Sequence, residues 1–194
     1  MPDNRMRIAY VHDSPLYESL ATDYRNPHRL AELGFTDVVI SDQMSGCLYE
    51  ITPELIGKVD EAADSGLNVW LMDDLFTLPI ETDASCPGRE ETWRLTAQAI
   101  RDVIEAVPQI RGLVFRYGET FESSNSTLKR VNLLDCNCID CSSMDGIDRR
   151  RKVVDLLEKI VCREGGKRCI LRMWDMSEDG IHANRLLQSK VLSK

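Results

Sequence analysis

The stretch Gly112-Leu113-Val114-Phe115-Arg116-Tyr117-Gly118-Glu119-Thr120-Phe121 decides the expected fold. It begins with apolar residues that favour β-structure and then meets a cation, a glycine and a carboxylate. This order is typical of a buried parallel strand that carries polar groups at its C-terminal end. The segments 67–74 and 169–175 have the same layout, and the polar groups at their ends are Asp73, Asp74, Arg172 and Asp175. We therefore expect any chemistry at this end of the strands.

Strand-like and helix-like segments alternate along the chain. Strands are expected over 7–11, 37–42, 67–72, the quoted stretch and 169–173. Asn26-Pro27 and Thr52-Pro53 pair an N-cap residue with proline at the first helical position, and Gly34 and Gly66 end these two helices. Apolar periodicity predicts further helices over 93–107, 147–162 and 181–191. Strict alternation predicts a parallel sheet with right-handed crossovers, so all strand ends lie at one edge.

Two α/β architectures accept this order. A five-stranded, open, doubly wound sheet fits the 194 residues, whereas a (β/α)8 barrel takes about 250 residues. The loops favour the barrel, because the segment after the first strand, His12-Asp13-Ser14-Pro15-Leu16, has no glycine that could cradle a phosphate. We predict a single α/β domain over 1–194 that is the N-terminal part of a (β/α)8-type barrel, cut short after about five parallel strands. The open sheet is the alternative.

The charge of the chain limits its partners. The net charge is −8, which argues against nucleic acid and anionic membranes as partners. We interpret the basic run Arg149-Arg150-Arg151-Lys152 as a solvated helix face rather than a binding patch. No apolar run approaches the roughly 20 residues of a membrane span, and the N-terminus lacks a signal-peptide core. We expect a cytoplasmic protein, and the sequence does not predict its oligomeric state.

Several segments resemble a known family. They are Gly112–Glu119, Cys136–Cys141, and Ile170–Asp175 with the later Gly180-Ile181-His182. These segments resemble the barrel of family-67-like alpha-glucuronidases and related glycoside hydrolase-like proteins, and 29–34 followed by a strand fits the same pattern. The resemblance implies a carbohydrate-directed barrel of which this chain holds the first five units. In that superfamily the general acid commonly follows strand four, which corresponds to Glu119, and its partner carboxylate comes from a later strand that is not evident in this sequence.

The candidate site residues each have two interpretations. The apolar neighbours Tyr117 and Phe121 would favour a protonated Glu119, but this carboxylate could instead form an ion pair with Arg116 or Arg172. The two arginines occupy matched positions on neighbouring strands, which suits bidentate binding of a uronic acid carboxylate. A salt-bridge network inside the barrel is the alternative for both arginines.

The remaining candidates follow other strand ends. Asp73, Asp74 and Asp175 could bind sugar hydroxyls, or they could cap the helices that follow. Trp174 offers a stacking plane for a sugar ring or belongs to the core. His12 follows the first strand and His182 lies on the loop side of the fifth, so both are candidates for substrate binding.

A cysteine cluster lies in the long segment after the fourth strand. Cys136-x-Cys138-x-x-Cys141 brings together three soft ligands that suit zinc or an iron–sulfur cluster. A structural zinc has four ligands, and Cys47, Cys86, His182 or Asp140 could supply the fourth. A loop disulfide and unpaired thiols are the alternatives. The cluster thus suggests a structural zinc, whereas the predicted hydrolysis requires no cofactor.

These observations lead to one functional hypothesis with two rivals. The leading hypothesis is a glycoside hydrolase, in the uronic-acid-directed form or as a truncated fragment, that acts on a small-molecule or oligosaccharide substrate. The first rival is a non-catalytic carbohydrate- or uronate-binding barrel module. The second rival is a cysteine-bearing regulatory domain with an open sheet. Whether this chain is an enzyme depends on the missing carboxylate.

Overall fold

The computed structural model describes residues 6–12, 25–41, 51–75, 86–117, 139–142 and 146–173 of the chain. Strands and helices alternate as predicted, and their bounds differ from the expected ones by a few residues. The strands are β1 (Ile8–His12), β2 (Asp37–Ser41), β3 (Asn68–Asp74), β4 (Gly112–Tyr117) and β5 (Arg168–Met173). The helices are α1 (Pro27–Glu32), α2 (Pro53–Asp64), α3 (Glu90–Ala106) and α4 (Gly146–Leu157). The helix predicted over 181–191 lies outside the described residues.

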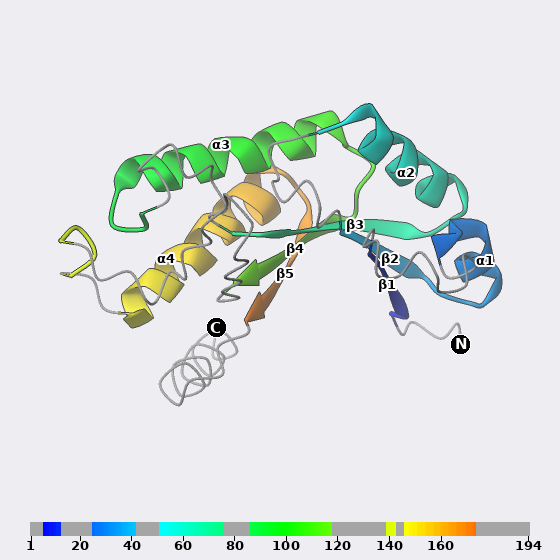
Figure 1. Ribbon diagram of the computed structural model, residues 1–194, viewed down its shortest axis with the longest axis horizontal. Coiled ribbons are helices and arrows are strands. Elements are labelled where there is room, and N and C mark those ends of the chain that lie inside the picture. The colour runs from blue at the N-terminus through cyan, green and yellow to red at the C-terminus, as the bar shows by residue number, and fades with distance from the viewer. Residues whose placement is uncertain are drawn as a thin grey trace, which may run out of the picture.

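The order of the strands distinguishes the two architectures. All described pairs are parallel, and the sheet has the order β1-β2-β3-β4-β5. A doubly wound sheet reverses its strand order at one point, so that helices cover both faces. Here every strand lies beside its predecessor, and right-handed crossovers then leave the helices on one face. Figure 1 shows the helices along the convex side of a curved sheet. The barrel prediction is confirmed, and the open-sheet alternative is wrong.

The first two helices begin and end where local chemistry predicts. The side chain of Asn26 accepts a hydrogen bond from the Arg29 amide at 3.1 Å, and that of Thr52 accepts one from the Leu55 amide at 3.2 Å. Each helix then starts with a proline. Gly34 has φ +84°, which favours glycine and lets the chain turn towards β2.

The fourth helix changes its winding before it ends. After α4 the chain continues as a π-helix, η4 (Glu158–Glu164), which the sequence pattern does not predict. Ile160 and Val161 are both buried there, although they are adjacent in sequence. The chain then reverses at Gly166, with φ +63°, and enters β5.

The sheet is covered by apolar residues on both faces. A large cluster fills the space between sheet and helices and includes Val38, Val69, Leu113 and Phe115. A smaller cluster lies on the opposite, inner face and contains Val39, Trp70, Met72 and Val114, with Ile8 and Ile170 packed against it. Because successive strand residues point to opposite faces, these two clusters assign a face to every strand position.

At the N-terminal ends of the strands, the inner cluster borders a buried polar group, the carboxylate of Asp37. Trp70 Nε1 donates a 2.8 Å hydrogen bond to Oδ1 of Asp37, which is buried, and Thr36 Oγ1 donates to its Oδ2 at 2.6 Å. A β-carbon at Gly112 would lie 2.7 Å from Trp70 Cζ3 and would overlap the Arg168 carbonyl group. Gly112 therefore allows Trp70 and β5 to approach β4 closely.

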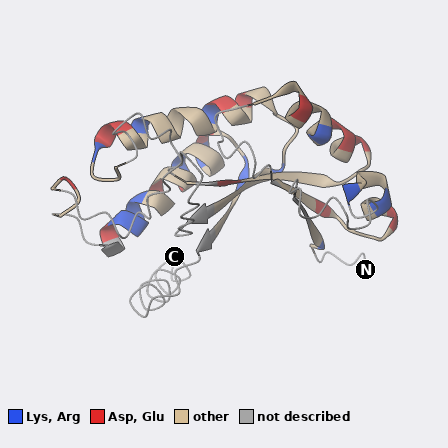
Figure 2. Ribbon diagram, viewed as in Figure 1, with Lys and Arg blue, Asp and Glu red and all other residues tan. Residues whose placement is uncertain are grey.

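The basic run at the start of α4 is only partly solvated. Arg149 and Arg150 are each 5% exposed, and Arg149 Nη2 donates to the carbonyl oxygen of Cys141. The interpretation as a solvated face is wrong for these two residues, because both are buried, and the 139–142 turn contacts Arg149. Lys152 instead pairs with Glu90 at 2.9 Å. Figure 2 shows these basic residues along α4.

Across the described ranges, none of the helices combines the length and the apolar character that crossing a bilayer requires.

Candidate functional site

Three predicted site residues form one row across the C-terminal ends of adjacent strands. The parallel register pairs Asp74 of β3 with Arg116 of β4, and Arg116 with Arg172 of β5. Asp74, Arg116 and Arg172 each lie two residues after Met72, Val114 and Ile170, which belong to the inner cluster or pack against it. Because strand positions two apart lie on the same face of a sheet, the row belongs to the inner face. The prediction that the two arginines occupy matched positions is confirmed at the level of the backbone register.

The register separates Asp73 from Asp74, which the sequence treats alike. Asp73 pairs with Phe115 and has the parity of Leu71, and both of these side chains belong to the helix-side cluster. His12 closes β1 opposite Ser41 and has the parity of Ile8 on the inner face. Of the two aspartates, only Asp74 therefore shares a row and a face with Arg116.

Several predicted site residues lie outside the described residues. They are Glu119, Trp174, Asp175, His182, Cys136 and Cys138. Glu119 follows the last residue of β4, Tyr117, by two positions. Trp174 and Asp175 follow β5 directly, because this strand ends at Met173. The roles given to these residues stay predictions.

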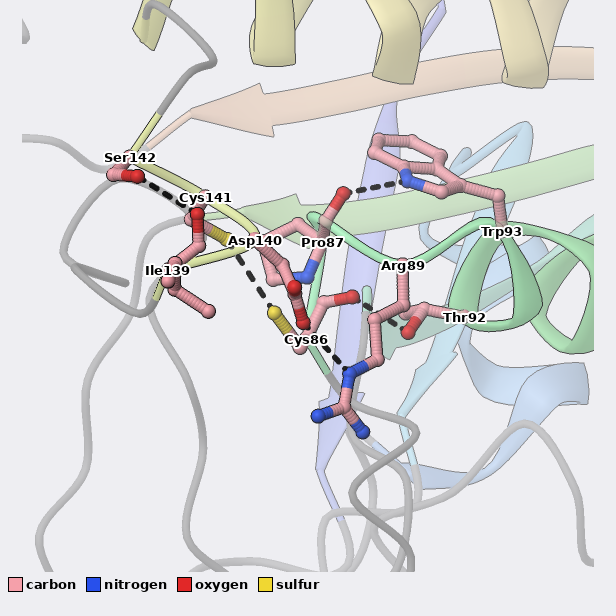
Figure 3. A network of polar contacts seen from close by, with 9 residues as sticks. All are labelled: Cys86, Pro87, Arg89, Thr92, Trp93, Ile139, Asp140, Cys141 and Ser142. Carbon is pink, nitrogen blue, oxygen red and sulfur yellow. Dashed lines mark hydrogen bonds and ion pairs between the residues drawn. The ribbon is translucent and has the colours of Figure 1, made fainter.

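Two segments that precede neighbouring helices meet beside the barrel. Cys86 lies before α3 and Cys141 lies before α4, and their Sγ atoms are 3.4 Å apart. Cys141 is completely buried. Next to this contact, Arg89 Nε pairs with Asp140 Oδ2 at 3.0 Å. Figure 3 shows the two sulfur atoms facing each other between the two segments.

Close backbone packing holds this contact in place. A β-carbon at Gly88 would lie 2.6 Å from the carbonyl carbon of Asp140, so only glycine allows this approach. The Thr92 hydroxyl donates to the Cys86 carbonyl at 2.6 Å, and Trp93 Nε1 donates to the Pro87 carbonyl at 2.7 Å. The start of α3 thereby fixes the segment that carries Cys86, as Figure 3 shows.

The structure distinguishes Cys86 from the other candidates for the fourth metal ligand. The sequence names Cys86 as one of four candidates, and the structure brings it to Cys141. Sequence reasoning missed Gly88 and Arg149, although a Pro-Gly turn just before a helix is a usable signal for close packing. In the part of the chain that the structure describes, no group of three or more His, Cys, Asp or Glu side chains could hold a metal ion. The zinc expectation therefore rests on residues both inside and outside the described ranges.

Comparison with known proteins supports the fold. The chain has the fold of a partial (β/α)8 barrel. It is similar to GH5_18 from Bifidobacterium longum subsp. longum in complex with Manβ1-4GlcNAc, with a TM-score of 0.52 and 12% identity over 86% of this chain and 43% of that one. It is also similar to the GH36 alpha-galactosidase AgaA from Geobacillus stearothermophilus in complex with stachyose, with a TM-score of 0.52 and 12% identity over 87% of this chain and 28% of that one.

These structural similarities concern the fold and do not extend to the sequence. No protein-family model matches the chain, and no curated protein is similar to it in sequence. The chain spans less than half the length of the two solved structures. At this identity the likeness establishes the fold, and the resemblance to family-67-like alpha-glucuronidases stays a prediction.

Proposed function

We propose that this chain is a carbohydrate-active, glycoside hydrolase-like barrel domain whose general acid is Glu119. The observation that carries the proposal is the row of Asp74, Arg116 and Arg172 at the C-terminal ends of three adjacent parallel strands. In (β/α)8 barrels, catalytic and binding groups come from this end of several strands. Glu119 follows β4, the middle strand of the three, by two residues.

The two structural neighbours support the class of substrate. One is in complex with Manβ1-4GlcNAc and the other with stachyose, so both contain a bound oligosaccharide. Fold alone does not fix function, because one barrel supports many chemistries. The proposal for this chain therefore depends on its own charged strand ends, and the neighbours favour a sugar over other small molecules.

Glu119 would donate a proton to the glycosidic oxygen as the bond to the leaving group breaks. A second carboxylate then has to act as the nucleophile or as the base for water, about 5 to 9.5 Å away. We assign no residue of this chain to that second role. Turnover by this chain alone thus tests whether the catalytic pair is complete.

The charge of the row favours an acidic sugar. One aspartate and two arginines sum to a formal charge of +1, because −1 plus +2 is +1. A uronic acid carboxylate would neutralise the row, and the planar guanidinium group suits a carboxylate through two parallel hydrogen bonds. In this proposal Trp174 stacks on the sugar ring, and Asp175, His12 and His182 contribute to substrate binding at the strand ends, whereas the register of Asp73 with Phe115 removes Asp73 from this set.

The test combines turnover and binding with the full chain. We expect hydrolysis of aryl glucuronides in preference to aryl glucosides, and calorimetric binding of glucuronate that is tighter than that of glucose. Binding of glucuronate without any turnover would contradict the catalytic assignment and select a non-catalytic binding module. Absence of both binding and turnover would overturn the proposal as a whole.

A further inference from the structure

We propose that Cys86 and Cys141 are a redox-active thiol pair that a peroxide converts into a reversible disulfide. The two cysteines are 55 positions apart in the sequence. Cys86 lies in the connection between β3 and α3, and Cys141 lies in the connection between β4 and α4. The disulfide would therefore fasten two successive strand-to-helix connections of the barrel to each other. This inference does not depend on the proposed carbohydrate function.

The two sulfur atoms are in contact but not bonded. Their Sγ atoms are 3.4 Å apart, and either thiol can donate a hydrogen bond to the other. A disulfide bond is about 2.05 Å long, so the sulfur atoms would have to approach each other by about 1.4 Å. Movement of this size is within the reach of side-chain rotation, because each Sγ atom turns about its own Cα–Cβ bond. Figure 3 shows the two sulfur atoms facing each other.

The two segments that carry the thiols are held together on both sides of the contact. A β-carbon at Gly88 would lie 2.6 Å from the carbonyl carbon of Asp140, so the two backbones touch here. Arg89 Nε pairs with Asp140 Oδ2 at 3.0 Å. Because the backbones stay in contact, the reaction between the thiols is intramolecular and has a high effective concentration.

Each cysteine is also anchored through its own carbonyl group. The Thr92 hydroxyl donates to the Cys86 carbonyl oxygen at 2.6 Å, and Arg149 Nη2 donates to the Cys141 carbonyl oxygen. Thr92 belongs to α3 and Arg149 belongs to α4. Each helix thus holds the cysteine that precedes it, and the pair sits between two fixed elements.

The burial of the two side chains assigns their roles in the oxidation. Cys141 is completely buried, whereas Cys86 is only partly buried. Oxidation of a cysteine requires that the oxidant reach its sulfur atom. A peroxide from the solvent therefore meets Cys86 first, and Cys141 is the resolving thiol.

The reaction has two steps, and the peroxide is its oxidant. In the first step, the Cys86 thiolate attacks the O–O bond of the peroxide ROOH, a sulfur–oxygen bond forms, and ROH leaves. In the second step, the Cys141 sulfur attacks the resulting sulfenic acid, the sulfur–sulfur bond forms, and water leaves. Overall, two thiols and one ROOH give one disulfide, one ROH and one water. The two sulfur atoms lose two electrons in total, and the peroxide gains them.

The first experiment uses the unsubstituted full chain, so it does not depend on the folding of a variant. The chain is purified under reducing conditions, freed of reductant and treated with hydrogen peroxide. The remaining thiols are then alkylated, and the peptides are mapped by mass spectrometry without reduction. We expect the loss of two hydrogens and a peptide pair joined through Cys86 and Cys141. A dithiol reductant added before alkylation should restore both thiols.

Three variants test the order of the two steps. In Cys141→Ser, peroxide should leave a sulfenic acid on Cys86, which dimedone traps. In Cys86→Ser, Cys141 should stay a thiol, because the oxidant does not reach it. Cys162→Ser is the matched control, because Cys162 is an exposed cysteine in η4, and it should form the same disulfide as the wild-type chain.

Several results would overturn the proposal. They are the persistence of both thiols in the peroxide-treated wild-type chain, protection of both thiols by a bound metal ion, and a disulfide from either cysteine to a different one. Loss of the disulfide in Cys162→Ser would also overturn it, since the oxidation would then pass through Cys162. A dimedone adduct on Cys141 in Cys86→Ser would contradict the assignment of Cys86 as the thiol that the peroxide attacks.

Discussion

Arg116 of β4 lies directly opposite Arg172 of β5 in the parallel register. Two like charges at paired positions on neighbouring strands are unfavourable unless an anion compensates them. Asp74 flanks Arg116 on the other side and supplies one negative charge. In the proposed function, the carboxylate of an acidic sugar would compensate the remaining positive charge.

Substitution of Arg172 by lysine should weaken the binding of an acidic sugar. Lysine keeps the charge but loses the planar fork, so we expect glucuronate affinity to fall about tenfold to a hundredfold. Calorimetry with glucuronate and glucose measures the effect, and glucose affinity should stay unchanged. Arg168→Lys is the control, because Arg168 begins the same strand and is exposed. Equal losses in both variants would argue against a role in binding.

Gly112→Ala should disrupt the close packing of Trp70 and β5 against β4. The added methyl group would lie 2.7 Å from Trp70 Cζ3 and meet the backbone of β5, so we expect a loss of about 1–3 kcal/mol in the free energy of unfolding. Urea denaturation measures it. The control is Gly57→Ala in α2, where nothing lies within 4 Å of the added carbon. That variant should gain about 0.5–1 kcal/mol, because alanine favours helix.

Trp70→Phe measures how much the buried hydrogen bond from Trp70 to Asp37 contributes to the free energy of unfolding. The ring is largely preserved, but the buried carboxylate loses a donor, which costs about 1–3 kcal/mol. A double-mutant cycle with Asp37→Asn isolates the interaction from the change in packing. A coupling free energy near zero would mean that the hydrogen bond adds nothing to stability.

Cys169 should react with an alkylating agent more slowly than Cys162 does. Burial raises the pKa of the Cys169 thiol to about 12, and the nearby Cys162 adds to the shift. Alkylation at pH 8 should therefore modify the exposed Cys162 long before Cys169. Peptide mapping after timed alkylation measures both rates, and equal rates would contradict the expected difference.

Because the pKa of Cys169 is raised in the folded protein, the free energy of unfolding should vary with pH in the alkaline range. The unfolded thiol loses its proton near pH 9, whereas the folded thiol keeps it until about pH 12. Stability from the neutral buried thiol is therefore fully present below pH 9 and falls as the pH rises towards 12. In urea denaturation, Cys169→Ala should reduce this decline relative to the wild-type chain.

The sequence predicted the elements of the fold well, and its loops favoured the barrel that the structure confirms. Local chemistry set the helix boundaries, as the Asn26 and Thr52 caps show. Strand order depends on which strands pair, and strand–helix alternation is common to barrels and open sheets. The absence of a glycine after the first strand favoured the barrel, and the observed pairing of consecutive strands excluded the doubly wound sheet.

The sequence predicted some features of the candidate site and missed others. Arg116 and Arg172 were matched correctly because both strands have the same length of apolar run before the cation. Asp73 and Asp74 could not be separated, because face assignment depends on the register with Phe115 and Arg116. The burial of Arg149 was missed, since the turn that covers it comes from outside its helix.

The most direct test of the proposed function is the leaving-group dependence of Glu119→Gln. A general acid matters most when the leaving group is poor, so turnover of an alkyl glucuronide should fall about 10²–10⁴-fold, and turnover of a dinitrophenyl glucuronide should change little. Glu105→Gln, at an exposed position of α3, is the control and should match the wild-type chain. Equal losses for both substrates, or unchanged turnover of the alkyl glucuronide, would contradict the assignment of Glu119 as the general acid.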